Sequence, residues 1–119
     1  MSDLPIQIAN FFTAMQAGRA GGAAMAALFA EDAVYVEPFS GAPQRHEGRA
    51  AVMAAMARGW DYPMPDMRIA IDRAEARGNV IDLDWTCHSP ALPGGKGAGR
   101  NRFTMRDGLI AELVTTLGG

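Results

Sequence analysis

The side chain best suited to acid–base chemistry in this sequence is Glu37. It ends the stretch Ala33–Glu37, which is rich in β-branched and aromatic residues, and Pro38 follows it directly. These residue types favour a short strand, and proline ends a strand because it cannot donate a ladder hydrogen bond. A glutamate in a dry pocket becomes more basic and can abstract a proton. The alternative is a strand-end glutamate that faces water.

Two histidines and a cysteine are the other candidates for chemistry. His46 lies in the polar segment 44–48, where a solvent-exposed loop residue is the default expectation. His88 could act as an acid or base, but alternation along its strand places it on the face opposite the apolar residues. Cys87 alternates with Trp85 on the apolar side and has no basic neighbour in the sequence. We therefore expect a buried, neutral thiol.

The elements that must position these residues follow from the spacing of the apolar residues. Intervals of three and four predict three helices, at Leu4–Ala17, Ala23–Ala30 and Arg49–Trp60. Beyond residue 66 apolar and polar residues alternate, which predicts strands joined by tight turns at 67–72, 81–88, 101–106 and 109–117. Because helices come first and strands dominate later, we expect an α+β fold with the helices on one face of a mostly antiparallel sheet.

Length and composition limit the class of protein. A chain of 119 residues, of which 49% are hydrophobic, can bury one core, and we expect a single domain over residues 1–119. The net charge of −2 leaves no basic surface for nucleic acid. No apolar run approaches the roughly 20 residues that cross a bilayer, and a single cysteine favours a reducing compartment. We therefore expect a cytoplasmic protein that binds neither nucleic acid nor a membrane.

The order of these elements, together with a few short motifs, resembles a known family. The motifs are Phe-Ala-Glu-Asp-Ala at 29–33, Glu37-Pro38, a helix start at Gly48 and Arg-Asp-Gly-Leu-Ile at 106–110. Over nearly its whole length the chain is similar to the nuclear transport factor 2-like superfamily, in particular its ketosteroid isomerase-like and SnoaL-like polyketide cyclase members. The resemblance implies a cone: a curved mixed, mostly antiparallel sheet packed on three N-terminal helices around one deep apolar cavity. It also implies a homodimer.

The resemblance assigns roles to individual residues. Ketosteroid isomerase moves a proton next to a carbonyl with a carboxylate base, while a tyrosine and a protonated acid stabilise the oxyanion. Glu37 takes the place of the base, and Asn101 takes that of the acid donor; a turn or edge residue is the alternative for Asn101. Phe11 and Met56 stand where the family has tyrosines. Each oxyanion donor lost from an acyl-transfer site costs about 3 to 4 kcal/mol, so we do not expect efficient steroid isomerisation.

An apolar interior is also indicated by the excess of methionine over tyrosine, 8 against 2, because methionine fills adaptable apolar space. For most of the residues that the resemblance places around the cavity, an ordinary core position is the alternative. The expected ligand is a hydrophobic small molecule, with no cofactor and no metal. The expected cavity residues are Phe11, Met15, Phe39, Met56, Trp60, Trp85, Cys87, Phe103 and Met105.

Three functions are consistent with these residues. The first is a small cofactor-independent isomerase or cyclase that abstracts a proton next to a carbonyl, with Glu37 as base and Asn101 as donor. The second is a non-catalytic module that binds a hydrophobic ligand, which Phe11 and Met56 favour. The third, water addition or removal, requires a carboxylate beside an arginine or histidine inside the cone. Arg102 and Asp84 are the nearest such pair in the sequence, and alternation predicts that both face outward.

Overall fold

The computed structural model describes residues 5–39, 41–60 and 66–118, and it combines helices with one sheet. The first predicted helix begins at Ile6 in the structure, with Pro5 as its N-cap. The predicted start, Leu4, lies outside the described residues. A short 3-10 turn, Gly18–Gly21, links the first two helices. The helices are α1 (Ile6–Ala17), α2 (Gly22–Ala26) and α3 (Arg49–Trp60).

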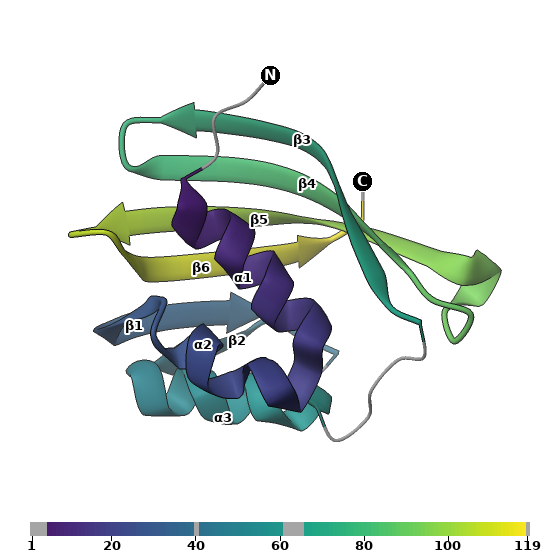
Figure 1. The fold of residues 1–119 in the computed structure, drawn as a ribbon, viewed down its shortest axis with the longest axis horizontal. Helices are drawn as coiled ribbons and strands as arrows, with labels where there is room; N and C mark the ends of the chain where they lie inside the picture. The colour runs from purple at the N-terminus through teal and green to yellow at the C-terminus, as the bar shows by residue number, and fades with distance from the viewer. Residues whose placement is uncertain (1–4, 40, 61–65, 119) are drawn as a thin grey trace.

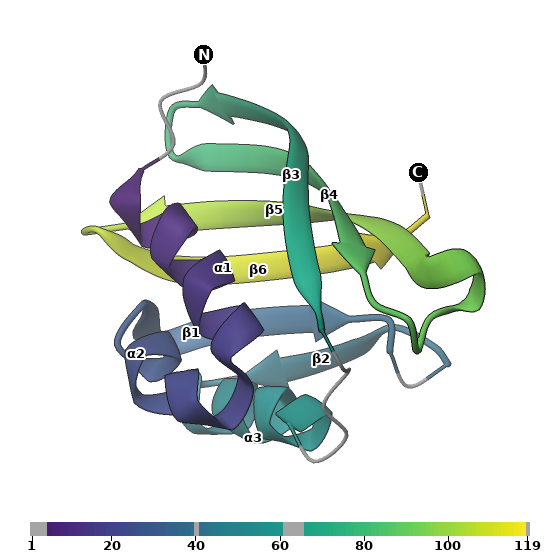
Figure 2. The same cartoon turned by 45° about the vertical axis from the view of Figure 1, so that its right-hand side comes forward.

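The sheet has six strands in the order β2-β1-β6-β5-β4-β3. The β1–β6 pair is parallel and every other neighbouring pair is antiparallel, so the sheet is mixed. The long strands curve around α1, and the helices lie on the hollow side of the sheet (Figures 1 and 2). The strands are β1 (Phe29–Glu37), β2 (Gln44–Glu47), β3 (Arg68–Arg77), β4 (Val80–His88), β5 (Lys96–Arg106) and β6 (Leu109–Leu117).

The two faces of the sheet differ because polar and apolar residues alternate along β4 and β5. On the inner face Ile81, Leu83 and Phe103 are almost fully buried. On the outer face Arg102 binds Asp82, with Arg102 Nε 2.8 Å from Asp82 Oδ1. The burial of one face explains why the register of this strand pair is continuous, since a shift by one residue would exchange the two faces.

The centre of the core is a group of aromatic rings between α1 and the sheet. Phe11 contacts Phe12 and Phe103 edge-to-face, each with ring centroids 5.1 Å apart, and contacts Phe29 at 6.3 Å. These geometries are typical of favourable aromatic pairs. Ile8, Phe11 and Phe12 are all buried. Their spacing of three and four residues places one stripe of α1 against the sheet, as predicted.

The predicted second helix and first strand were wrong in their boundaries. The helix ends at Ala26 rather than Ala30, and β1 begins at Phe29 rather than Ala33. The reason is tertiary: Ile110 N donates to Leu28 O at 2.8 Å, and Phe29 pairs with Ile110 of β6. The apolar residues at 25, 28 and 29 satisfy helical spacing, but pairing with a distant strand decides their conformation.

The segment expected to be a loop at 44–47 is a strand. β2 pairs antiparallel with β1, and Tyr35 lies directly opposite His46. Its residues are not typical strand formers, so their composition gives no sign of the pairing. This strand places His46 beside the end of β1, where Glu37 lies.

No helix in the described part of the chain is long and apolar enough to span a membrane.

Candidate functional site

Glu37 lies on the inner face of the sheet, at the end of β1. Ala33, Tyr35 and Glu37 alternate inward along the strand, and Glu37 is only 3% exposed. The backbone N–H of Phe39 donates to Oε1 at 2.7 Å, and His46 Nε2 lies 2.9 Å from Oε2. A buried carboxylate needs such partners because burying it without them is costly. Glu37 is therefore held in a dry and defined position.

His46 and Arg58 complete the surroundings of this carboxylate. The His46 side chain is 15% exposed, and the centroid of its ring lies 6.0 Å from the centroid of the Tyr35 ring. Arg58 of α3 reaches toward Oε2 of Glu37, with Nη2 at 3.9 Å, although most of its side chain is exposed. We expected His46 to be an exposed loop residue; the pairing of β2 with β1 brings it to Glu37 instead.

Asn101 lies on the same inner face, two strands away from Glu37. It is 4% exposed and sits in the middle of β5, opposite Thr115 of β6. Its Oδ1 accepts hydrogen bonds from Thr115 Oγ1 at 2.8 Å and from Trp85 Nε1 at 3.1 Å. It is therefore a buried, fixed amide and not a turn residue.

Glu37 and Asn101 are joined by one row of residues across the sheet. β6 lies between β1 and β5, and Val36 pairs with Val114, so Glu37 and Thr115 are next in register. Neighbouring strands are about 4.8 Å apart, which puts the backbones of Glu37 and Asn101 about 10 Å apart. The two side chains thus share a face, with Thr115 between them.

Tyr35 extends this polar row. Its hydroxyl is buried, and burial, followed by the negative charge of Glu37, raises the pKa of Tyr35, while a hydrogen bond with Thr115 lowers it. The net shift is upward, so the phenol stays protonated where an ordinary tyrosine begins to ionise at about pH 10. Tyr35 is a neutral hydroxyl beside the carboxylate.

We expect this shift to appear in the alkaline stability of the protein. Above about pH 10 the unfolded chain loses the Tyr35 proton while the folded chain keeps it, so the unfolded state binds fewer protons. The free energy of unfolding then falls as the pH rises, by up to about 1.4 kcal/mol per pH unit from this residue. Urea unfolding at a series of alkaline pH values measures the slope. Tyr35→Phe should make it less steep, and an unchanged slope would contradict the assignment.

The expected cavity residues fall into three groups. Phe11, Met56, Cys87 and Phe103 are buried, and burial raises the pKa of the Cys87 thiol. Met15, Trp60, Trp85 and Met105 are partly buried and pack against the core. Phe39, in contrast, is 58% exposed, and its part at the site is the backbone N–H that binds Glu37.

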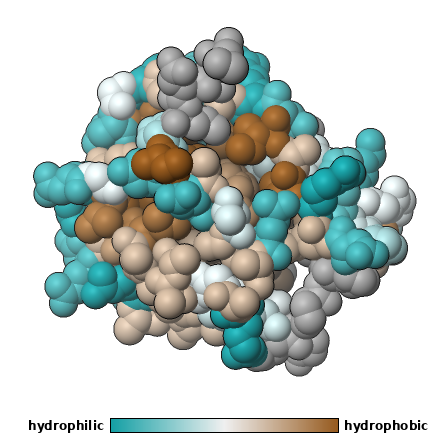
Figure 3. Space-filling model, viewed as in Figure 1, coloured by the Kyte–Doolittle hydropathy of each residue, from teal (hydrophilic) through white to brown (hydrophobic). Residues whose placement is uncertain are grey.

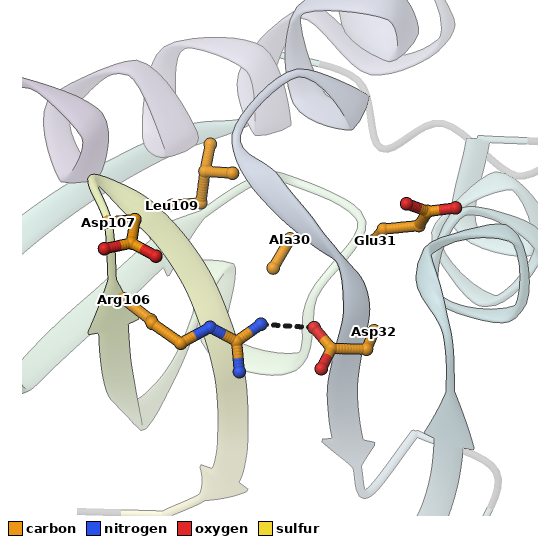
Figure 4. Close-up of a pocket in the computed structure, with 6 residues that line it drawn as sticks. All are labelled: Ala30, Glu31, Asp32, Arg106, Asp107 and Leu109. Carbon is orange, nitrogen blue, oxygen red and sulfur yellow. Dashed lines mark hydrogen bonds and ion pairs between the residues drawn. The ribbon is translucent and has the colours of Figure 1, made fainter.

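Among the pockets in the described part of the chain are two surface hollows, and neither is the deep apolar cavity that the resemblance implies. One is an open hollow of about 530 Å³ between β1 and the β5–β6 turn, lined by Ala30, Glu31, Asp32, Arg106, Asp107 and Leu109. In it Arg106 and Asp32 point toward one another and form an ion pair, while Glu31 points away (Figure 4). The other is a charged hollow on the outer face of β3, β4 and β5.

The outer face of the sheet also holds the pair expected for water chemistry, in a different arrangement. Asp84 binds Arg100, with Nε 2.7 Å from Oδ1, and Arg102 binds Asp82. The proposed pairing of Arg102 with Asp84 was therefore wrong, because each arginine pairs with the aspartate directly opposite on β4. A carboxylate beside a histidine and an arginine does occur on the inner face, at Glu37.

Within the described ranges, no three His, Cys, Asp or Glu side chains gather closely enough to hold a metal ion.

The face that carries α1 and α2 is mixed, with hydrophobic residues scattered between hydrophilic ones (Figure 3).

Comparison with known proteins decides the family. The family model described as SnoaL-like domain matches residues 8–113, which is most of the chain. The chain belongs to the SnoaL-like domain family. No curated protein matches this SnoaL-like sequence.

Solved structures show the same fold for this SnoaL-like chain at low sequence identity. A candidate polyketide cyclase from Sinorhizobium meliloti has a TM-score of 0.78 and 22% identity, covering 96% of both chains. A candidate ketosteroid isomerase from Kribbella flavida has a TM-score of 0.75 and 23% identity, covering 97% of this chain and 77% of its own. An NTF2-like protein of unknown function from Cytophaga hutchinsonii has a TM-score of 0.73 and 13% identity, covering 99% of this chain and 93% of its own. These similarities establish an α+β, NTF2-like fold with a curved mixed sheet.

Proposed function

We propose that this protein abstracts a proton next to a carbonyl group of a hydrophobic small molecule, as a cofactor-independent isomerase or cyclase. The observation that carries the proposal is the carboxylate of Glu37, which is buried on the inner face and held by Phe39 N–H and His46. In this role Glu37 takes the proton, and Asn101 donates a hydrogen bond to the oxygen that becomes negative.

The proposal includes the surroundings of these two residues. The ligand would lie on the inner face, against the partly buried side chains of Met15, Trp85 and Met105 that pack on the core. An apolar cavity there, within a cone closed by the three helices, is part of the proposal. So are a homodimer and a single domain over residues 1–119. The names of the solved relatives, a candidate polyketide cyclase and a candidate ketosteroid isomerase, support the reaction class.

Hydrogen exchange tests the proposal directly. The protein is incubated in D2O with a panel of apolar cyclic ketones and enones, and loss of the proton next to the carbonyl is followed by NMR. We expect exchange faster than in buffer, and faster than with heat-denatured protein, for at least one structural class. Absence of exchange for the whole panel would contradict the proposal.

A non-catalytic binding module is the alternative, and the aromatic cluster favours it. Phe11 stands at the family's tyrosine position and has no hydroxyl to donate. Its ring is 1% exposed and contacts three other rings, so it serves apolar packing. A binding module needs an apolar ligand but no base. An apolar molecule that co-purifies with the protein and is released unchanged on unfolding, together with no exchange activity, would support this alternative.

Water addition or removal is also favoured by one observation, the group formed by Glu37, His46 and Arg58. A carboxylate with a neighbouring histidine can activate water or protonate a leaving hydroxyl. Incorporation of 18O from labelled water into an apolar epoxide or enone distinguishes this reaction from proton transfer to and from carbon, which incorporates no oxygen by that route.

A further inference from the structure

We propose that Trp85, Thr115 and Gly99 are positioning residues that orient the amide of Asn101, so that its two N–H groups serve a ligand oxygen. This inference deepens the proposed function and rests on it, because it explains how Asn101 could act as the donor. Trp85 and Thr115 touch Asn101 and not the reacting atoms in this scheme.

The orientation of the amide follows from the chemistry of its neighbours. An indole N–H can only donate a hydrogen bond, so the atom of Asn101 that lies 3.1 Å from Trp85 Nε1 must be the oxygen. Thr115 Oγ1 donates to the same oxygen at 2.8 Å. Two donors from two neighbouring strands therefore hold Oδ1, and Nδ2 is the end of the amide that remains for other partners.

Gly99 provides the space that Trp85 needs to reach Asn101. Gly99 lies opposite Trp85 in the β4–β5 pair and two residues before Asn101 on the same face. A Cβ atom at Gly99 would lie 2.3 Å from Trp85 Cζ2 and 2.7 Å from the carbonyl oxygen of Thr116. The indole thus lies across the position that any side chain would fill. A glycine here is explained by the contact between Trp85 and Asn101.

The Nδ2 group of Asn101 has no acceptor among the described residues. Asn101 is 4% exposed, and an unused buried donor costs about 1 to 3 kcal/mol. Of the described side chains, only Trp60 Nε1 is both fully enclosed and without a partner. Asn101 Nδ2 is therefore not fully enclosed, and we infer that a ligand or a water molecule can reach its donors, which are oriented before a ligand arrives.

Thr115 also connects Asn101 with the strand that carries Glu37. Thr115 also lowers the pKa of the Tyr35 hydroxyl, and Tyr35 lies two residues before Glu37 on the inner face of β1. Oriented donors of this kind stabilise a developing negative oxygen without reorganisation during the reaction. The ligand oxygen would thus be a carbonyl or enol oxygen above Asn101, with the acidic carbon toward Glu37.

The test compares two probes that differ by one oxygen, 2-naphthol and naphthalene, with binding to the intact protein measured by fluorescence titration. We expect wild-type protein to bind 2-naphthol more tightly than naphthalene. Thr115→Val removes one hydrogen bond and keeps the size and shape of the side chain. It should weaken 2-naphthol binding by about 3- to 10-fold, the range of one hydrogen bond, and leave naphthalene binding unchanged. Thr115→Ser should restore the affinity.

A second measurement separates positioning from general damage to the fold. In an Asn101→Leu background, Thr115→Val should cause no further loss of 2-naphthol affinity, because the two residues act through one group. Thermal unfolding monitored by circular dichroism checks that every variant is folded. The proposal is overturned by equal losses for both probes, by additive losses in the double variant, or by a wild-type protein that does not prefer 2-naphthol. Since the readout is binding, it is independent of whether ketone exchange is observed.

Discussion

Glu37→Gln is expected to lower the rate of deuterium exchange into an apolar ketone by a factor of about 10² to 10⁴, the usual contribution of a general base. Glutamine has nearly the same size as glutamate and can still accept the hydrogen bond that Phe39 N–H donates to Oε1 at 2.7 Å. It cannot take up a proton. The substitution therefore removes the chemistry and leaves most of the packing around a residue that is 3% exposed.

The matched control for this variant is Glu31→Gln. Glu31 lies on the same strand, but it is exposed and points away from the Arg106–Asp32 pair (Figure 4). Its substitution changes the net charge by the same amount, so any effect of charge alone appears in both variants. We expect exchange at the wild-type rate for Glu31→Gln. If Glu37→Gln also exchanges at that rate while remaining folded, Glu37 is not the base.

Phe11→Ala is expected to lower the free energy of unfolding by about 3 to 5 kcal/mol, as for other buried phenylalanines. Phe11 is 1% exposed and contacts the rings of Phe12, Phe29 and Phe103. Its removal leaves a hole between α1 and the sheet, in addition to the lost burial of the ring. Chemical denaturation followed by circular dichroism measures the loss.

Phe39→Ala serves as the comparison, because the Phe39 side chain is 58% exposed and the variant keeps the backbone N–H that binds Glu37. We expect a change within about 0.5 kcal/mol, as for most surface substitutions. The pair of variants also decides between two interpretations of Phe11. A loss as small as that of Phe39→Ala would mean that the Phe11 ring borders empty space, as a cavity wall does, and is not part of a packed core.

The parts of the fold that were predictable from the sequence are those where local pattern and tertiary contacts agree. Along β4 and β5, alternation of apolar and charged residues predicts both the strands and their faces, and the structure has Leu83 and Phe103 inside and Arg102 outside. The stripe of α1 that includes Phe11 is likewise buried. In both cases the hydrophobic period of the sequence matches the period of the element.

The prediction was wrong where a distant strand decides the local conformation. The spacing of residues 27–30 fits a helix, but Phe29 pairs with Ile110 of β6 in the parallel β1–β6 pair. His46 was expected in a loop, and four residues of β2 bring it to Glu37. The hydrogen bonds of Asn101 were not predictable at all, because they join β4, β5 and β6. The deep apolar cavity that the resemblance implies stays a prediction, since the two hollows described above lie elsewhere on the sheet.

The sequence by itself determined the fold class and the types of side chain available for chemistry: one carboxylate at a strand end, few histidines and an interior rich in methionine. Tertiary structure alone decided which of these side chains share a site. Glu37 acquires His46 from β2 and Arg58 from α3, and Asn101 acquires Trp85 and Thr115 from the strands on either side. The physical reason is that burial follows from local periodicity, whereas the partners of a buried polar group depend on strand order and register, which are set by long-range pairing.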